Sequence, residues 1–155
     1  MTTSRYQKII VPLDGSGWSQ RAIPHALHLA RTNDAELILT HVFTSPSREF
    51  TDQLALAHQE EQIQHLRQQA KRYLVGVRSE LRRENIRVRT HYIEGSATEG
   101  VASLLCDYIM SEKADLVVMS THGRTGVSRL LFGSIARSVM ECIDIPVMLI
   151  QPEKE

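Results

Sequence analysis

Short apolar runs recur along the chain and alternate with segments of helical spacing. Unbroken apolar runs are typical of strands covered on both faces, as in a parallel sheet. The run Arg87–Ile93 alternates with polar residues, which predicts a position near a sheet edge. Strands alternating with helices predict an α/β fold, an open five-stranded parallel sheet with helices on both faces. The predicted strands are Lys8–Leu13, Glu36–Phe43, Arg87–Ile93, Asp115–Met119 and Val147–Ile150.

The intervening segments predict the helices. One follows Asp14-Gly15-Ser16-Gly17 and continues to about Arg31, and Pro24 within it should kink the helix or delay its regular part. A second, amphipathic helix of about 25 to 30 residues covers the apolar positions from Leu56 to Leu81. Ser96 and Glu99 match a capping box ahead of a third helix. The last helix spans Ser134 to about Cys142.

Length and charge limit the function classes. The chain of 155 residues, with 18 basic and 18 acidic side chains, predicts a single domain over residues 1–155 that binds neither nucleic acid nor an anionic membrane. We expect no signal peptide and no membrane insertion, because no apolar run is long enough. The two cysteines, Cys106 and Cys142, are expected to be reduced core thiols of a cytoplasmic protein rather than a disulfide or metal pair.

Two loops leave predicted strand ends with chemistry suited to an anion: Asp14–Gly17 and Ser120–Ser134. Ligands of such sheets bind outside the carboxyl ends of the strands. Glycines let backbone N–H groups approach a phosphate, a helix amino terminus adds unpaired donors, and Arg124 or Arg129 adds charge. Alternatively, the loop glycines adopt positive φ in turns and Ser134 caps a helix. Neither a Walker A motif nor a complete dinucleotide fingerprint is present.

The spacing Ser120-x2-Gly123-x9-Gly133-Ser134 resembles the G-x2-G-x9-G-[ST] signature of nucleotide-binding universal stress proteins. The resemblance covers the whole chain, through KIIVPLDGS, LTHV, VVMSTHGRTG, GSIARSV and IPVMLI in that order. It implies a Rossmann-like sheet of order 3-2-1-4-5, similar to adenine nucleotide alpha hydrolases. It also implies ATP, or ADP or AMP, near the ends of the first and fourth strands.

The same resemblance implies roles for individual residues. Pro12 and Val42 would line the adenine, and Asp14 would accept hydrogen bonds from the ribose hydroxyls. Gly123, Arg124, Gly133, Ser134 and Ile135 would surround the phosphates. The complete expected nucleotide site is Pro12, Leu13, Asp14, Val42, Met119, Ser120, His122, Gly123, Arg124, Gly126, Gly133, Ser134 and Ile135.

Ser120 departs from the signature, which has glycine at that position. Its Cβ takes space near the ligand and disfavours positive φ, whereas its hydroxyl is suited to a phosphate contact. Asp14 also has a structural alternative, as the N-cap of the first helix or in an Asx turn. His122 has a proton-transfer alternative, since imidazole titrates near neutral pH.

The resulting hypothesis is a cytoplasmic stress-response protein that binds ATP or ADP and acts as a sensor or signalling component with an unknown partner. It has no catalytic residues, and no metal site apart from Mg²⁺ entering with ATP. We expect a homodimer through Val147, Met148, Leu149 and Ile150, because a short apolar edge strand can pair with its symmetry mate. The alternatives are a protein-interaction dimer without nucleotide, and a slow ATPase.

Overall fold

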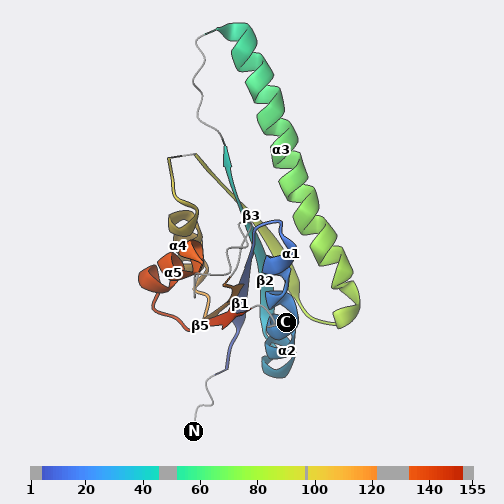
Figure 1. Ribbon diagram of the computed structural model, residues 1–155. Helices are drawn as coiled ribbons and strands as arrows, with labels where there is room; N and C mark the ends of the chain where they lie inside the picture. Colours follow the sequence, from blue (N-terminus) through green and yellow to red (C-terminus); the bar gives the residue numbers. More distant parts are fainter. Residues whose placement is uncertain (1–4, 46–51, 97, 122–132, 152–155) are drawn as a thin grey trace.

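The protein is described by a computed structural model that covers residues 5–45, 52–96, 98–121 and 133–151. Its strands form one parallel sheet of order β3-β2-β1-β4-β5 (Figure 1), which confirms the predicted fold and places β3 at an edge. The strands are β1 (Lys8–Leu13), β2 (Glu36–Ser45), β3 (Val88–Ser96), β4 (Leu116–Ser120) and β5 (Val147–Ile150).

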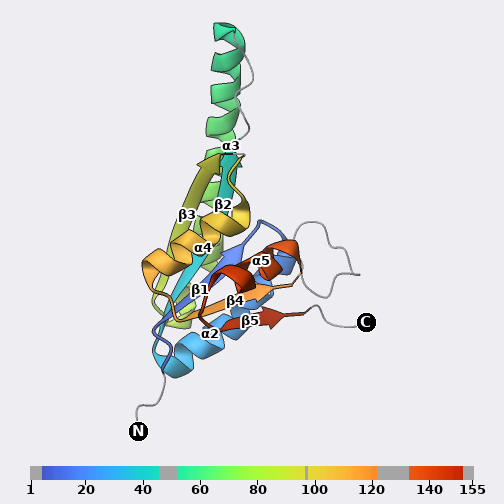
Figure 2. The ribbon, with the colours of Figure 1, turned by 90° about the vertical axis from the view of Figure 1, so that its left-hand side faces the viewer.

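Helices cover both faces of the sheet. They are α1 (Gly17–Gln20), α2 (Ala22–Asn33), α3 (Gln53–Glu80), the 3-10 helix η1 (Arg82–Glu84), α4 (Val101–Glu112) and α5 (Ser134–Cys142). Helices α2 and α3 pack on one face, and α4 and α5 pack on the other (Figure 1). The long helix α3 extends beyond the sheet (Figures 1 and 2). None of the helices described is both long and apolar enough to cross a membrane.

Burial on both faces explains the unbroken apolar runs. Successive residues of a strand point to opposite faces, and here both faces are covered. In β1, Ile9 packs in the cluster beneath α2 and α3, whereas Ile10 packs in the cluster beneath α4 and α5, and both are fully buried. The sheet therefore lies between two apolar layers, and its ends are the parts that helices leave open.

The first predicted helix is divided in two. Helix α1 ends at Gln20 and α2 begins at Ala22, so Pro24 is the third residue of a new helix. Proline is tolerated in the first turn because the N–H it lacks would have no acceptor within the helix. Pro24 thus delays the regular helix, which is one of the two predicted alternatives. The 28-residue α3 agrees with the predicted long helix.

Two strands are longer than their apolar patterns indicate. The hydrogen-bonded pairing of β2 with β3 continues to Ser45 opposite Ser96, because backbone pairing does not require apolar side chains. The Glu99 carboxylate accepts a hydrogen bond from Ser96 N–H at 2.8 Å, as in the expected capping box. However, the N-cap of α4 is Gly100, so this bond closes the turn ahead of the helix.

The expectation that both cysteines are reduced is wrong for this structure. Cys106 on α4 and Cys142 at the end of α5 form a disulfide, with their Cα atoms 6.3 Å apart. The two residues are 36 positions apart in sequence. They meet because α4 and α5 pack side by side on the same face of the sheet, a tertiary contact that no local pattern predicts.

A charged network closes the amino end of the sheet. The Arg89 guanidinium on β3 donates to Glu36 Oε1 at 2.7 Å and to both carboxylate oxygens of Glu112, at 3.0 and 2.9 Å. Lys8 Nζ lies 3.4 Å from Glu112 Oε2. The hydrogen bonds from Arg89 are the main cause that lowers the pKa of Glu112 to about 2. The network therefore ties an edge strand to the helix on one face.

We expect Glu112→Gln to lower the free energy of unfolding at pH 7 by about 1 kcal/mol, as for a partly exposed ion-pair network. The Glu112 pKa is lowered in the folded state, so its contribution is present above the ordinary value of 4.5 and is lost as pH falls towards about 2. Urea denaturation at pH 7 and pH 3 measures both effects. Glu61→Gln, at an exposed position of α3, is the control. If Glu112→Gln lost as much stability between pH 7 and pH 3 as the unmodified protein does, this assignment would be contradicted.

Candidate functional site

A cavity of about 660 Å³ opens at the carboxyl ends of β1, β2 and β4. In a parallel sheet this edge, where the strand order reverses, is the usual place for a ligand. The following expected site residues line it: Pro12, Leu13, Asp14, Val42, Met119, Ser120, Gly133, Ser134 and Ile135. The remaining expected residues, His122, Gly123, Arg124 and Gly126, lie outside the described residues. The structure therefore brings together segments from four separate parts of the chain.

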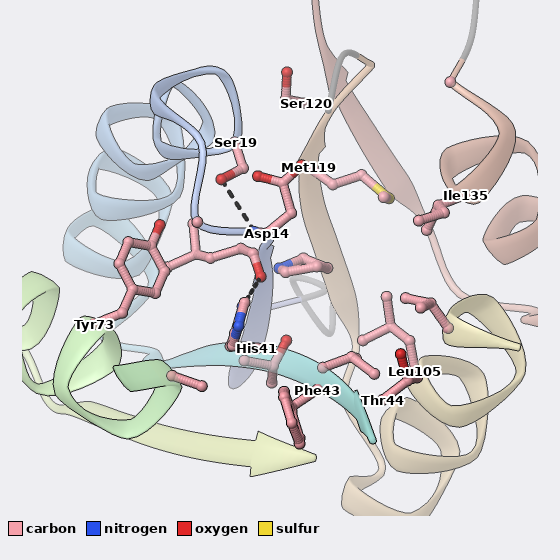
Figure 3. Close-up of a pocket in the computed structure, with 18 of the residues that line it drawn as sticks. Asp14, Ser19, His41, Phe43, Thr44, Tyr73, Leu105, Met119, Ser120 and Ile135 are labelled. Carbon is pink, nitrogen blue, oxygen red and sulfur yellow. Dashed lines mark hydrogen bonds between the residues drawn. The ribbon is translucent and has the colours of Figure 1, made fainter. Parts of the chain in front are cut away.

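The turn after β1 fixes the Asp14 carboxylate at the cavity wall. Asp14 Oδ1 accepts hydrogen bonds from Ser16 N–H at 2.8 Å and from the Ser16 hydroxyl at 2.5 Å, which is an Asx turn. Asp14 N–H donates to Ser19 Oγ at 3.2 Å (Figure 3), and Gly15 supplies the positive φ of 88° that the turn needs. The N-cap of α1 is Ser16, so the N-cap alternative for Asp14 is wrong.

Gly133 is required for a close backbone approach. Its φ is −59°, so the alternative of a positive φ is wrong at this position. Gly133 N–H donates to the carbonyl oxygen of Thr121 at 2.8 Å, and a Cβ on Gly133 would lie 2.5 Å from that oxygen. Any larger residue would push α5 away from the end of β4. The glycine therefore places the amino terminus of α5 directly beside the strand.

The first turn of α5 lines the cavity with N–H groups that have no acceptor within the helix. The N-cap is Gly133 and not Ser134, so the alternative in which Ser134 caps the helix is wrong, and no side-chain capping bond is present. Backbone bonding begins at Arg137 N–H, which donates to Gly133 O at 3.0 Å. The N–H groups of Ser134, Ile135 and Ala136 consequently have no acceptor within the helix. Together with the helix dipole they favour an anion in the cavity.

Ser120 is the last residue of β4 and pairs with Ile150. It has extended backbone and is absent from the residues with positive φ. The alternative in which serine is strained at this position is therefore wrong. Serine replaces the glycine of the signature without a backbone penalty, and its side chain lies at the cavity wall beyond Met119 (Figure 3).

Several lining residues were not identified from the sequence. His41 is buried, its Nδ1 lies 2.8 Å from Leu13 O, and its ring packs edge-on against Tyr73 at 5.5 Å (Figure 3). The Thr40 hydroxyl is buried, and the described part of the chain offers it no hydrogen-bond partner. Helix α3 contributes Leu66, Gln69, Ala70 and Tyr73. The sequence contains a signal for Thr40 and His41, because these two polar residues interrupt an otherwise apolar strand.

Charge around the cavity is sparse among the described residues. Its ionisable lining consists of Asp14, His41 and Tyr73, and no lysine or arginine of the described segments joins them. Attraction for an anion in this part of the site thus comes from helix N–H groups rather than from cations. Within the same segments, no cluster of three or more histidine, cysteine, aspartate or glutamate side chains is arranged to hold a metal ion.

Comparisons with known proteins agree with this geometry. Residues 5–151 match the Universal stress protein family. Universal stress protein MJ0531 of Methanocaldococcus jannaschii is 32% identical over 152 residues, covering 97% of this chain and 85% of that protein. The fold resembles the structure of hypothetical protein MJ0577, with a TM-score of 0.80, 23% identity and coverage of 98% and 100% of the two chains.

A universal stress protein family structure from Arabidopsis thaliana, with AMP bound, has a TM-score of 0.63 and 18% identity, covering 95% of this chain and 92% of that one. At this identity the likeness concerns the fold alone. The match to the family extends over nearly all of the described sheet and its helices, and a relative above 30% identity covers the same length. This chain is a member of the universal stress protein family.

Proposed function

We propose that the cavity binds an adenine nucleotide, ATP, ADP or AMP, with Mg²⁺ entering alongside ATP. The observation that carries the proposal is the meeting, in one cavity, of an apolar slot, a fixed carboxylate and an uncapped helix amino terminus. A nucleotide has a matching sequence of parts, namely a flat base, a ribose diol and an anionic phosphate chain. The AMP bound by the Arabidopsis relative supports the same ligand class here.

The base would lie among apolar side chains on the α4 and α5 side of the sheet. Pro12, Val42 and Met119 line this part of the cavity, and Leu105 of α4 and Ile135 of α5 complete it. Apolar walls around a few polar groups are typical of small-molecule sites, where burial supplies affinity and hydrogen bonds supply orientation. Removing both faces of the base from water would provide most of the binding free energy.

The ribose and phosphates would follow the line from Asp14 to the start of α5. The Asp14 carboxylate would accept hydrogen bonds from the ribose hydroxyls, since its turn holds it at the wall. The N–H groups of Ser134 and Ile135 and the Ser134 hydroxyl would receive the phosphates. His122, Gly123, Arg124 and Gly126 complete the proposed site on the strength of the family signature.

In this proposal the protein is a cytoplasmic sensor or signalling component, and binding rather than turnover is its activity. Two outcomes would replace the proposal. A dimer that binds no nucleotide would be an interaction module, and phosphate release from ATP would identify a slow ATPase.

The open edge of β5 is the proposed dimer interface. β5 pairs with β4 on one side, and none of the described strands lies on its other side. Val147 and Leu149 pack against the cluster beneath α4 and α5, whereas Met148 is 37% exposed. Leu149 therefore belongs to the core of its own chain. Pairing with a second copy would use the backbone of Val147–Ile150 and the exposed Met148.

We expect the purified protein to bind ATP or ADP with a Kd in the micromolar range, which corresponds to a binding free energy on the order of −8 kcal/mol. Val42→Trp should weaken binding at least about tenfold, because the indole would occupy the base position. Val75→Trp, at a position of α3 that is 58% exposed, is the control. Isothermal calorimetry with Mg²⁺ measures affinity, and circular dichroism confirms folding. The absence of heat and of a thermal shift at millimolar nucleotide would overturn the proposal.

Ser120→Ala and Ser120→Gly should both weaken ATP binding by about 0.5 to 1.5 kcal/mol, as expected for the loss of a typical hydrogen bond to phosphate. Neither change relieves strain, because Ser120 has ordinary strand backbone. The affinities of both variants are measured beside the unmodified protein. Tighter binding by the glycine variant would show that the serine obstructs the ligand instead of contacting it.

Light scattering at micromolar concentration should report a dimer. Met148→Lys should shift the protein towards monomer, since it places a charge beside the paired edge strands, whereas Met110→Lys on α4, at a position 55% exposed, should leave the dimer unchanged. Leu149→Lys should reduce folding stability instead, because Leu149 packs in its own core. A monomeric unmodified protein would remove the proposed interface.

A further inference from the structure

The disulfide between Cys106 and Cys142 joins the two helices on one face of the sheet, and the chain contains no other cysteine. Cys106 lies on α4 and is 3% exposed, within an apolar cluster that includes Leu105 and Val139. Cys142 is the last residue of α5 and is exposed. Cys142 is thus the more accessible end of the bond, and Cys106 is held in the core.

This asymmetry matters because disulfides exchange by direct attack of a thiolate on a sulfur atom. Access to the sulfur limits the rate, so exchange begins at Cys142 and Cys106 serves as the resolving partner. A disulfide sealed inside the core on both sides would be inert once formed. The position of Cys142 at a helix end, rather than beneath a helix, keeps this bond within reach of a dissolved thiol.

We propose that Cys106 and Cys142 form a site of reversible oxidation by low-molecular-weight disulfides such as oxidised glutathione, and that its redox state controls how firmly α5 is held. On oxidation, the Cys142 thiolate attacks one sulfur of oxidised glutathione and releases one glutathione thiolate. The Cys106 thiolate then attacks the Cys142 sulfur and releases the second. Two protons leave the protein thiols and two electrons pass to the glutathiones, which are recovered as two thiols. Excess reduced glutathione reverses both steps.

The disulfide can change the order of α5 because this helix has few other stabilising contacts. The helix has nine residues, and its buried side chains are Ala136 and Val139. A helix of this length is not stable by itself in water, so its order depends on its tertiary contacts. Covalent attachment to the longer α4, which is anchored by Leu105, Cys106 and Ile109, restrains α5 at its carboxyl end.

The restraint extends to the cavity through both helices. Leu105, adjacent to Cys106, lines the cavity from α4, and Ser134 to Ala136 line it from α5. Cys142 lies about two helical turns from Ser134, on the same rigid element. Oxidation therefore fixes the helix amino terminus that the proposed nucleotide site uses. This last consequence rests on the proposed function, whereas the oxidation site does not.

The first test counts thiols in the full chain. The protein is equilibrated with glutathione buffers from fully reduced to fully oxidised, trapped with a maleimide under denaturing conditions, and weighed by mass spectrometry. We expect two labels under excess reduced glutathione and none, without an intermolecular crosslink, under excess oxidised glutathione. Cys142→Ser should keep one free thiol in every buffer, because the remaining Cys106 is buried. A protein that keeps both labels in every buffer, or neither, would overturn the proposal.

The second test measures hydrogen exchange of the backbone amides in both states. Reduction should raise exchange in α5 at least about tenfold while leaving β1 and α2 unchanged, since the disulfide restrains α5 and involves neither β1 nor α2. Cys142→Ser should behave like the reduced protein under oxidising conditions, which separates the bond from other effects of the buffer. Equal protection of α5 in the two states would refute its control by the disulfide.

The third test compares ADP affinity. The oxidised protein should bind about three- to tenfold more tightly than the reduced protein, because its helix amino terminus is held in place before binding. If neither state binds ADP, the proposed function fails, but thiol counting and hydrogen exchange still decide the oxidation site. If both states bind equally, the link between the disulfide and the cavity is contradicted.

Discussion

The pairing of β1 with β2 on one side and β4 on the other is the constraint on which the rest of the structure depends. The chain leaves β1 towards β2 and leaves β4 towards β5, in opposite directions across the sheet. Crossovers between parallel strands are right-handed, so opposite directions send the following helices to opposite faces. Helix α2 therefore lies on one face and α5 on the other, and the space between their connections is the cavity.

Local physics accounts for the parts of this fold that the sequence could predict. Unbroken apolar runs define β1 and β4 because both of their faces are buried, and the helical spacing from Leu56 to Leu81 defines α3. Pro24 marks a helix start because a proline nitrogen can only occupy the first turn without losing a bond. These features depend on neighbours within one element, so a single sequence is sufficient to find them.

The unpredicted features depend on contacts between elements. The disulfide requires α4 and α5 to lie side by side, which no spacing within either helix reveals. The sequence predicts Gly133 as a turn residue with positive φ or a phosphate neighbour, whereas its immediate constraint is the carbonyl of Thr121, just after β4. His41 was read as part of a buried strand, and only the fold places its ring beside Tyr73 at the cavity. For the site, the family resemblance predicted residues that line the cavity, whereas the hydrogen bonds that hold them in place are seen only in the structure.

The charged network at the amino end of the sheet also has a mechanical consequence. Arg89, Glu36 and Glu112 link β3, β2 and α4 there, and the Asp115 carboxylate accepts from the N–H groups of Gln7 and Lys8 at the start of β1. At the carboxyl end, the elements meet around a cavity instead. The elements are therefore joined by ion pairs and hydrogen bonds at the amino end of the sheet, whereas a cavity lies between them at the carboxyl end. We expect any displacement of the helices at the cavity to be a small rotation about their joined amino ends.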